Sequence, residues 1–351
     1  MDNLDFSRLF EHIECVKSNT HYWLVRSMGG DYFHEFTTRG YIGIGYNEVS
    51  LTEIKYAVSF GKGPTECLRE LIDKNEAIKY SMTSGEGEIN SQYAATQLLK
   101  FYRDIKVGDI IVVPGHRSGR VVIARVESDV YEEQQVSKLA GLCNFIKRRK
   151  ICVLKKTMRG LLNPKLQLMF NSRHIISNAD DYAEYIDSCI SDFYQKDGCT
   201  SLVLRVKEKN DLRAADFGLV PDLIELVQEF SDENNLNIDT NSIKSKICVQ
   251  SPGDILMFAD DNWAGIALAG LILIVLVGGE FKWDKNGVKV SSLGLHGILG
   301  AISNFLDRRR ERIERKKLLE KINNMKIDSP EALLKALSSK NKQNDDKSDE
   351  S

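Results

Sequence analysis

The sequence predicts an α+β protein with more than one domain. Short segments rich in β-branched residues alternate with amphipathic helical segments over the first two thirds of the chain. One uncharged run, Asn262 to Gly279, interrupts the polar last third, and a strongly basic segment follows it. At 351 residues the chain is long enough for two or three domains.

The composition is that of a folded globular protein, with 42% hydrophobic and 28% charged residues. The net charge of −2 gives no general affinity for nucleic acid, so any such binding must come from a local patch. The seven cysteines form no CxxC pair, which predicts reduced thiols and neither structural zinc nor any other metal or cofactor. The first residues are acidic and lack an apolar core, so we expect no secretory signal and a cytoplasmic location, or one at the cytoplasmic face of the inner membrane.

Local signals set the elements of the first part. Ser50 followed by Glu53 has the capping-box spacing, and Asn90 is placed to cap a second helix. The turn Lys106 to Asp109 leads into a strand. In order, we expect helices over 5–16, 32–38, from 50, 90–102, 132–148, from 157 with a break near Pro164, and 180–194, and strands over 21–26, 41–46, 110–113, 120–126 and 151–155.

The last third predicts a small α+β unit, then a hairpin and a long helix. Asn286-Gly287 is a hairpin signal, because both residues tolerate positive φ. We expect strands over 202–206, 247–250 and 255–258, a helix over 219–230, a hairpin of 280–284 and 288–292, one basic helix over 293–321, and a disordered tail over 340–351.

Three segments together resemble the N-terminal domain of Mrr-type restriction proteins, which is similar to the PUA-like and EVE-like mixed barrels. They are HYWLVRSMGGDYFHEFTTRGYIGIGYNEV, QLLKFYRDIKVGDIIVVPGHRSGRVVIARVES and KICVLKKTMRGLLNPKLQLMFNSRHI, and the resemblance covers residues 15–195. It implies a PUA/EVE-like recognition domain over 1–198, with Tyr46 where such domains usually carry tryptophan.

The resemblance implies a pocket for an extruded base or a nucleotide, which needs flat aromatic walls. The candidate walls are Trp23, Tyr46, Tyr93 and Phe101, and the candidate phosphate contacts are His116, Arg117 and Arg120. Trp23 and Phe101 fit a core position equally well, and His116 also fits a solvated loop. The basic group Lys147 to Lys150 either tracks a nucleic-acid backbone or is a solvated helix end and edge strand.

Mrr-type proteins also carry a nuclease domain, in which an Asp and a Glu/Gln-x-Lys on adjacent strands hold Mg²⁺. The nearest match here is Asp260 or Asp261 with Glu280 and Lys282. The apolar helix predicted between them replaces the required hairpin, so a modification-dependent endonuclease is the alternative and not the main expectation.

The uncharged run has three interpretations. As a helix it would be about 27 Å long, close to a bilayer core. It inserts into the inner membrane, it is buried between subunits of a homo-oligomer, or it is a core helix of the monomer. A lone span would export a long segment that carries no signal, so a lipid hairpin or partner subunits are preferred. We divide this part into 199–259 (the α+β unit), 260–322 (apolar helix, hairpin and basic helix) and 323–351 (short helix and tail).

The resemblance to Mrr-type proteins implies a bacterial defence context, and together with the uncharged run it leads us to expect a sensor rather than an enzyme. Its first domain would bind foreign or modified nucleic acid, or a nucleotide, and its C-terminal part would oligomerise or associate with the membrane. Besides the nuclease, a second alternative to the sensor is an adaptor that delivers nucleic acid to a partner enzyme.

Overall fold

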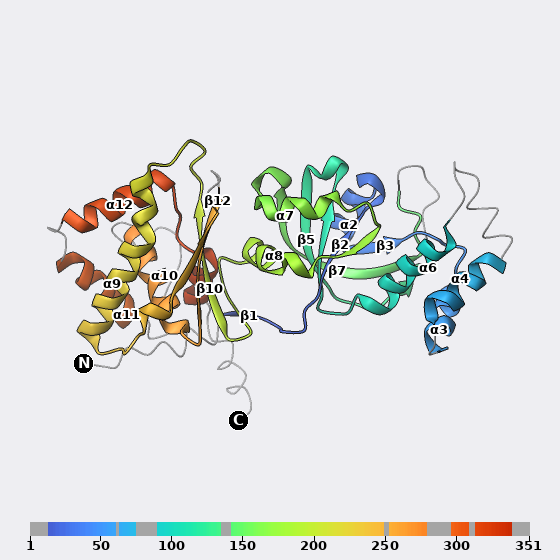
Figure 1. Cartoon of the computed structure of the whole chain (residues 1–351), viewed down its shortest axis with the longest axis horizontal. Helices are drawn as coiled ribbons and strands as arrows, with labels where there is room; N and C mark the ends of the chain where they lie inside the picture. Colours follow the sequence, from blue (N-terminus) through green and yellow to red (C-terminus); the bar gives the residue numbers. More distant parts are fainter. Residues whose placement is uncertain are drawn as a thin grey trace, which may run out of the picture. The chain divides into compact units, whose positions relative to one another are not determined.

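The structure, a computed structural model, describes residues 13–60, 63–74, 90–134, 142–248, 253–278, 296–308 and 313–338. The chain divides into two compact units (Figure 1). We call residues 19–190 the half-barrel unit, and residues 1–18 with 191–351 the terminal unit. The chain is therefore α+β, as predicted, and its N-terminal strand belongs to the same unit as its C-terminal half.

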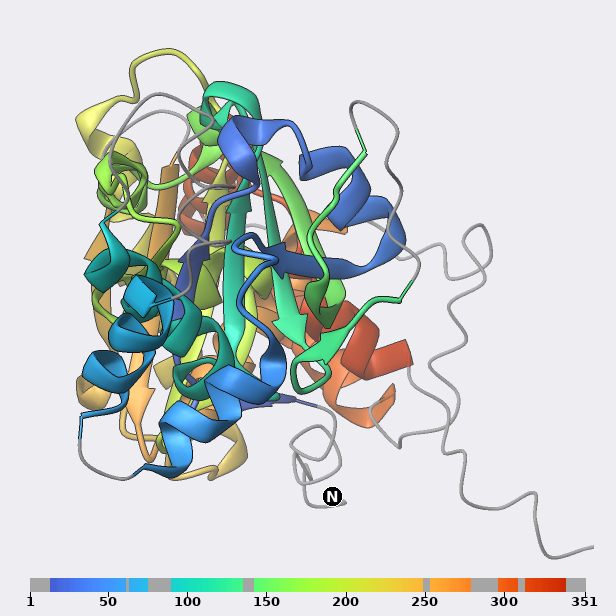
Figure 2. The ribbon, with the colours of Figure 1, turned by 90° about the vertical axis from the view of Figure 1, so that its right-hand side faces the viewer.

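A curled mixed sheet forms the centre of the half-barrel unit (Figure 2). Its strands follow the order β3-β7-β5-β4-β2-β8, and β6 pairs with β7. Strands β2 and β4 are parallel, and the other pairs are antiparallel. The strands are β2 (Tyr22–Val25), β3 (Tyr41–Ile44), β4 (Ile110–Pro114), β5 (Arg120–Val126), β6 (Tyr131–Glu132), β7 (Lys147–Met158) and β8 (Ile176–Asn178).

The long strand β7 produces the curl, because its first part pairs with β3 and its second part with β5. A bulge between Ile123 and Ala124 adds to the bend. As a result, the sheet has an inner and an outer face, each with its own buried core.

Helices cover both faces of this sheet. The inner core packs against α2 (Phe33–Arg39), α3 (Leu51–Ser59), α4 (Pro64–Lys74) and α6 (Ser91–Leu99), and the outer core against α7 (Pro164–Leu168) and α8 (Ala183–Ile190). Helices α3, α4 and α6 lie together at one end of the unit (Figures 1 and 2). The short helical turns are η1 (Met28–Gly30), η2 (Lys100–Asp104, a π turn), η3 (His116–Ser118), η4 (Arg159–Leu161), η5 (Met169–Asn171) and η6 (Asp180–Tyr182).

Both predicted caps are confirmed. Ser50 and Glu53 form a reciprocal capping box at α3, and the Asn90 side chain accepts from the backbone nitrogen of Tyr93 at the start of α6. The strands predicted around Trp23, Gly43, Val112 and Ile123 are present.

Three element predictions in this half of the chain are wrong. Residues 131–132 and 147–148 are strands and not part of a helix over 132–148, whose residues 135–141 lie outside the described residues. Residues 14–16 form strand β1 (Glu14–Val16) where a helix was expected to end. Strand β7 continues to Met158, so the helix expected from 157 begins only at Pro164, the residue type favoured at a first helical turn.

The terminal unit is a five-stranded sheet with its helices packed on one apolar core. The strands follow the order β1-β9-β10-β12-β11, with β9 (Phe193–Lys196), β10 (Cys199–Val206), β11 (Lys244–Ile247) and β12 (Gly253–Asp260). Its helices are α9 (Leu219–Asn234), α10 (Trp263–Val277), α11 (His296–Arg308), α12 (Ile313–Met325) and α13 (Glu331–Ser338), with short turns η7 (Ala214–Gly218) and η8 (Thr240–Ser242).

The uncharged run forms α10, which lies between the sheet and helices α9, α11 and α12 (Figure 1). Ile266, Leu271 and Leu273 are fully buried, and a Cβ on Gly270 would come within 2.6 Å of Leu333 on α13. Of the three interpretations, the structure shows the core helix of a single chain. Within the described residues, no helix combines the length and the apolarity that a membrane crossing requires.

The basic segment after α10 differs from the prediction. Helices α11 and α12 are separate elements where one helix over 293–321 was expected, and residues 309–312 between them lie outside the described residues. The predicted hairpin of 280–292 and the tail from 340 also lie outside them.

Candidate functional site

Two of the four predicted aromatic walls are core residues. Trp23 on β2 is 6% exposed, and its indole nitrogen donates to the Asp109 carboxylate over 2.9 Å. Phe101 is 1% exposed and lies under the guanidinium of Arg149. Neither ring is available to stack on a base in this structure.

The other two, Tyr46 and Tyr93, are half-buried neighbours at the inner face of the half-barrel. We call them the tyrosine pair. Burial and the nearby Tyr93 hydroxyl raise the pKa of Tyr46 to about 12. The Tyr93 hydroxyl accepts from the backbone nitrogen of Ile175 over 3.0 Å, and its ring lies 5.7 Å from that of His174.

Several contacts hold Tyr46 in an unfavourable backbone conformation. Its φ of +59° is rare for a bulky residue. The Lys147 ammonium donates to the carbonyl oxygens of Tyr46 and Val49 over 2.7 and 2.9 Å. Next to it, the Asn47 amide donates to the carbonyl of Asn144. Such over-determined strain is typical of binding sites.

The predicted phosphate contacts His116, Arg117 and Arg120 are exposed, and we call them the basic loop. It follows strand β4, and the loop after the parallel strand β2 packs directly against it. Gly30 has a φ of +110°, and a Cβ there would come within 2.2 Å of the His116 backbone nitrogen. The Ser27 hydroxyl also donates to the Pro114 carbonyl over 2.8 Å.

Within the described part of the half-barrel unit, every non-glycine residue with positive φ lies in these loops. Met28, Arg117 and Ser118 have positive φ values of 52°, 50° and 56°, like Tyr46. Strain of this kind costs on the order of 1–3 kcal/mol per residue, so it persists only where the surrounding contacts enforce it.

The Tyr93 hydroxyl and the basic loop lie at the same end of strands β2 and β4, whereas Tyr46 follows β3, which pairs with the first residues of the long strand β7. Ile175, which Tyr93 binds, accepts from the backbone nitrogen of Arg26 on the neighbouring chain segment. Strands β2 and β4 are parallel, and Leu24 pairs with Val112. Two residues further along each strand, Arg26 therefore lies beside Pro114. Two strand spacings therefore separate Ile175 from the start of the basic loop, about 10 Å.

Sequence reasoning missed Arg26 and His174, which belong to this end of the sheet. The Arg26 guanidinium donates to the carbonyls of Phe170 and Ser172 and so fixes the segment before β8. No local pattern marks either residue, because the partners of Arg26 lie 144 and 146 positions away in the sequence and the ring neighbour of His174 is Tyr93.

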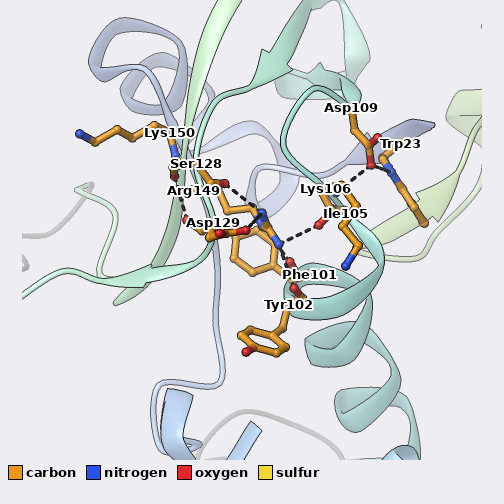
Figure 3. Close-up of polar contacts among 10 residues, drawn as sticks. All are labelled: Trp23, Phe101, Tyr102, Ile105, Lys106, Asp109, Ser128, Asp129, Arg149 and Lys150. Atoms are coloured by element: carbon orange, nitrogen blue, oxygen red, sulfur yellow. Dashed lines mark hydrogen bonds and ion pairs between the residues drawn. The ribbon is translucent and has the colours of Figure 1, made fainter. Parts of the chain in front are cut away.

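The basic run Lys147 to Arg149 is buried and structural. Lys147, Arg148 and Arg149 are 0%, 5% and 1% exposed. The Arg149 guanidinium donates to four carbonyls, those of Phe101, Tyr102, Ile105 and Ser128, at 2.8–2.9 Å (Figure 3). These side chains neither track a nucleic acid nor form a solvated face, and only Lys150 of the group is exposed.

The residues of the nuclease alternative do not form an observed site. Asp260 ends β12 and forms an exposed ion pair with Lys244 at 3.4 Å. Glu280 and Lys282 lie outside the described residues. Among the residues with assigned positions, no three His, Cys, Asp or Glu side chains come close enough together to hold a metal ion.

Comparison of the chain with models of known protein families gives no match, and comparison with curated protein sequences gives none either.

Proposed function

We propose that the half-barrel unit binds a nucleic acid or a nucleotide, with a base at the tyrosine pair and a phosphate at the basic loop. One observation carries the proposal: Tyr93 of the half-buried tyrosine pair binds the backbone of Ile175, which lies two strand spacings, about 10 Å, from the start of the loop that carries the exposed Arg117 and Arg120.

The chemistry of the two parts is complementary. A tyrosine ring gives a base a flat apolar contact worth about 1–3 kcal/mol. Arg117 and Arg120 supply forked donors that fit phosphate oxygens. Contacts to phosphate do not distinguish one base from another. Half-buried tyrosine rings fit contact with an extruded or modified base better than contact with the grooves of a duplex.

The resemblance to Mrr-type restriction proteins leads us to assign this unit to a bacterial defence-type sensor. Because the terminal unit buries α10 in its own core, we propose that binding is signalled by self-association or by a partner enzyme rather than by inserting this helix into lipid. Sedimentation of the full chain with and without bound oligonucleotide tests this step, and an unchanged mass together with membrane pelleting would contradict it.

Fluorescence anisotropy with labelled oligonucleotides tests the binding site. The panel contains single-stranded DNA, single-stranded RNA, and duplex DNA with plain or methylated cytosine. We expect Tyr46→Leu to weaken binding of the preferred probe by about 5- to 150-fold. The exposed Tyr56→Leu is the matched control and should bind as the parent does.

The salt dependence of oligonucleotide binding tests the basic loop separately. Replacing both Arg117 and Arg120 by Met should lower the slope of log affinity against log salt by roughly 1.5. Arg103→Met, which removes an exposed arginine paired with Asp104, should leave that slope unchanged. Equal affinity and salt slope in all variants would refute the proposed site.

A further inference from the structure

A separate cavity opens in the half-barrel unit beside the edge strand β8. Its volume is about 400 Å³, within the range of small-molecule sites. Its polar lining includes Lys100, Ser172, His174, Ser177 and Asp181. None of these belongs to the tyrosine pair or the basic loop, although His174 packs against Tyr93.

Donor groups for an anion line this cavity. Within the residues that the structure places, the Lys100 ammonium has no hydrogen-bond or ion-pair partner, so its three protons are available. The hydroxyls of Ser172 and Ser177 lie 2.6 Å apart. Since one hydroxyl donates to the other, the second keeps its own proton for a further acceptor.

The surrounding structure holds these donors in place. Arg26 anchors the carbonyl of Ser172, and the buried Gln97 side chain accepts from the Ile176 backbone nitrogen at 2.7 Å. Lys100 begins the π turn η2, a departure from α-helix that is frequent at functional sites. The π turn is itself fixed by the buried Arg149, which binds its carbonyls.

The remaining lining suits an organic group rather than a bare anion. Asp181 is an exposed carboxylate that can accept from hydroxyl or amino protons of a ligand. Leu168 and Met169 give an apolar surface, and Tyr182 adds an aromatic ring. One cation, one carboxylate, two hydroxyls and an apolar wall together match a ligand with a charged phosphate and a hydroxylated, partly apolar remainder.

We propose that this cavity binds a small phosphomonoester of nucleoside monophosphate size, with the phosphate on Lys100 and the serine hydroxyls. Asp181 accepts from the sugar or base, and Tyr182 with Met169 covers the base. This cavity is separate from the tyrosine pair and the basic loop, so the chain would bind a free nucleotide here and an oligonucleotide there.

Isothermal titration calorimetry of the full chain tests this site. The probes are the four nucleoside 5′-monophosphates, ribose 5-phosphate, inorganic phosphate and adenosine. We expect at least one nucleotide to bind more tightly than inorganic phosphate, and adenosine to bind at least tenfold more weakly than its monophosphate. Lys100→Met and Ser177→Ala should each weaken nucleotide binding, Lys100→Met by tenfold or more.

Lys106→Met, which removes an exposed lysine a short way along the chain, is the matched control. Thermal unfolding of each variant shows whether it is folded. Wild-type affinity in a folded Lys100→Met, no binding of any probe, or equal binding of phosphate and nucleotides would overturn the proposal. Oligonucleotide anisotropy on the same variants separates the sites, because the nucleotide binding that Lys100→Met removes should persist in Tyr46→Leu, and Lys100→Met should retain oligonucleotide binding.

Discussion

The buried ammonium of Lys147 donates a 2.7 Å hydrogen bond to the carbonyl oxygen of Tyr46. Burial lowers the pKa of Lys147 to about 8, from 10.5 in an exposed lysine. The unfolded chain therefore binds more protons between pH 8 and 10.5, and this group adds stability as the pH rises through that window. Below pH 8 both states are protonated, and the contribution is absent.

We therefore expect the wild type to gain about 2 kcal/mol between pH 8 and 10 relative to Lys147→Met. Urea unfolding of both proteins at each pH gives the difference. Comparing the two proteins removes the opposing effect of the tyrosines, because burial raises the pKa of Tyr46 and so lowers stability at higher pH in both. A stability difference that is constant across this range would contradict the prediction.

Arg149 is predicted to be essential for folding of the half-barrel unit. Replacing it by Met leaves four carbonyls without their donor, and unsatisfied buried groups cost about 1–3 kcal/mol each. Arg149→Met should therefore lose at least about 3 kcal/mol, and Arg149→Lys should rescue little because an ammonium has only three donors. The exposed Lys150→Met should change the free energy of unfolding by less than about 0.5 kcal/mol.

Trp23 is predicted to act through stability and not through ligand contact. In Trp23→Phe, Asp109 loses the indole donor but keeps the backbone nitrogens of His21 and Lys106. We expect a loss of about 1–2 kcal/mol in urea unfolding with unchanged oligonucleotide affinity. A weakened affinity at unchanged stability would instead make Trp23 a wall of the binding site.

Local signals in the sequence were enough for some elements, because the relevant partners lie within three or four residues. Ser50 and Asn90 are examples, since each caps its own helix. The start of β7 is not predicted, since the charges of Lys147 to Arg149 indicate exposed side chains, whereas the structure buries them. Their hydrogen-bond partners come from four other segments, and no local pattern indicates these.

Of the residues predicted to bind a ligand, some lie where a ligand could reach them and others do not, because long-range packing decides which aromatic rings are buried. Tyr46 and Tyr93 lie together, and Arg117 and Arg120 are exposed, as the base-pocket interpretation needs. Trp23 and Phe101 have the same aromatic character but point into the core. Trp23 is buried where β2 pairs with β4 and β8, and Phe101 lies under the Arg149 side chain of β7, and the sequence specifies neither arrangement.

The last prediction concerns helix α10. An apolar helix suits both a lipid bilayer and a protein core, and the two differ in whether lipid or other side chains cover it. Leu273 is fully buried among side chains of its own unit. Leu273→Ala should therefore lose about 2.7–5 kcal/mol in urea unfolding of the chain in water. The matched Leu161→Ala removes a side chain that is 63% exposed and should change the free energy of unfolding by less than about 0.5 kcal/mol. If Leu273→Ala proved as stable as the wild type while the wild type pelleted with membranes, α10 would be a lipid-facing helix and not a core helix.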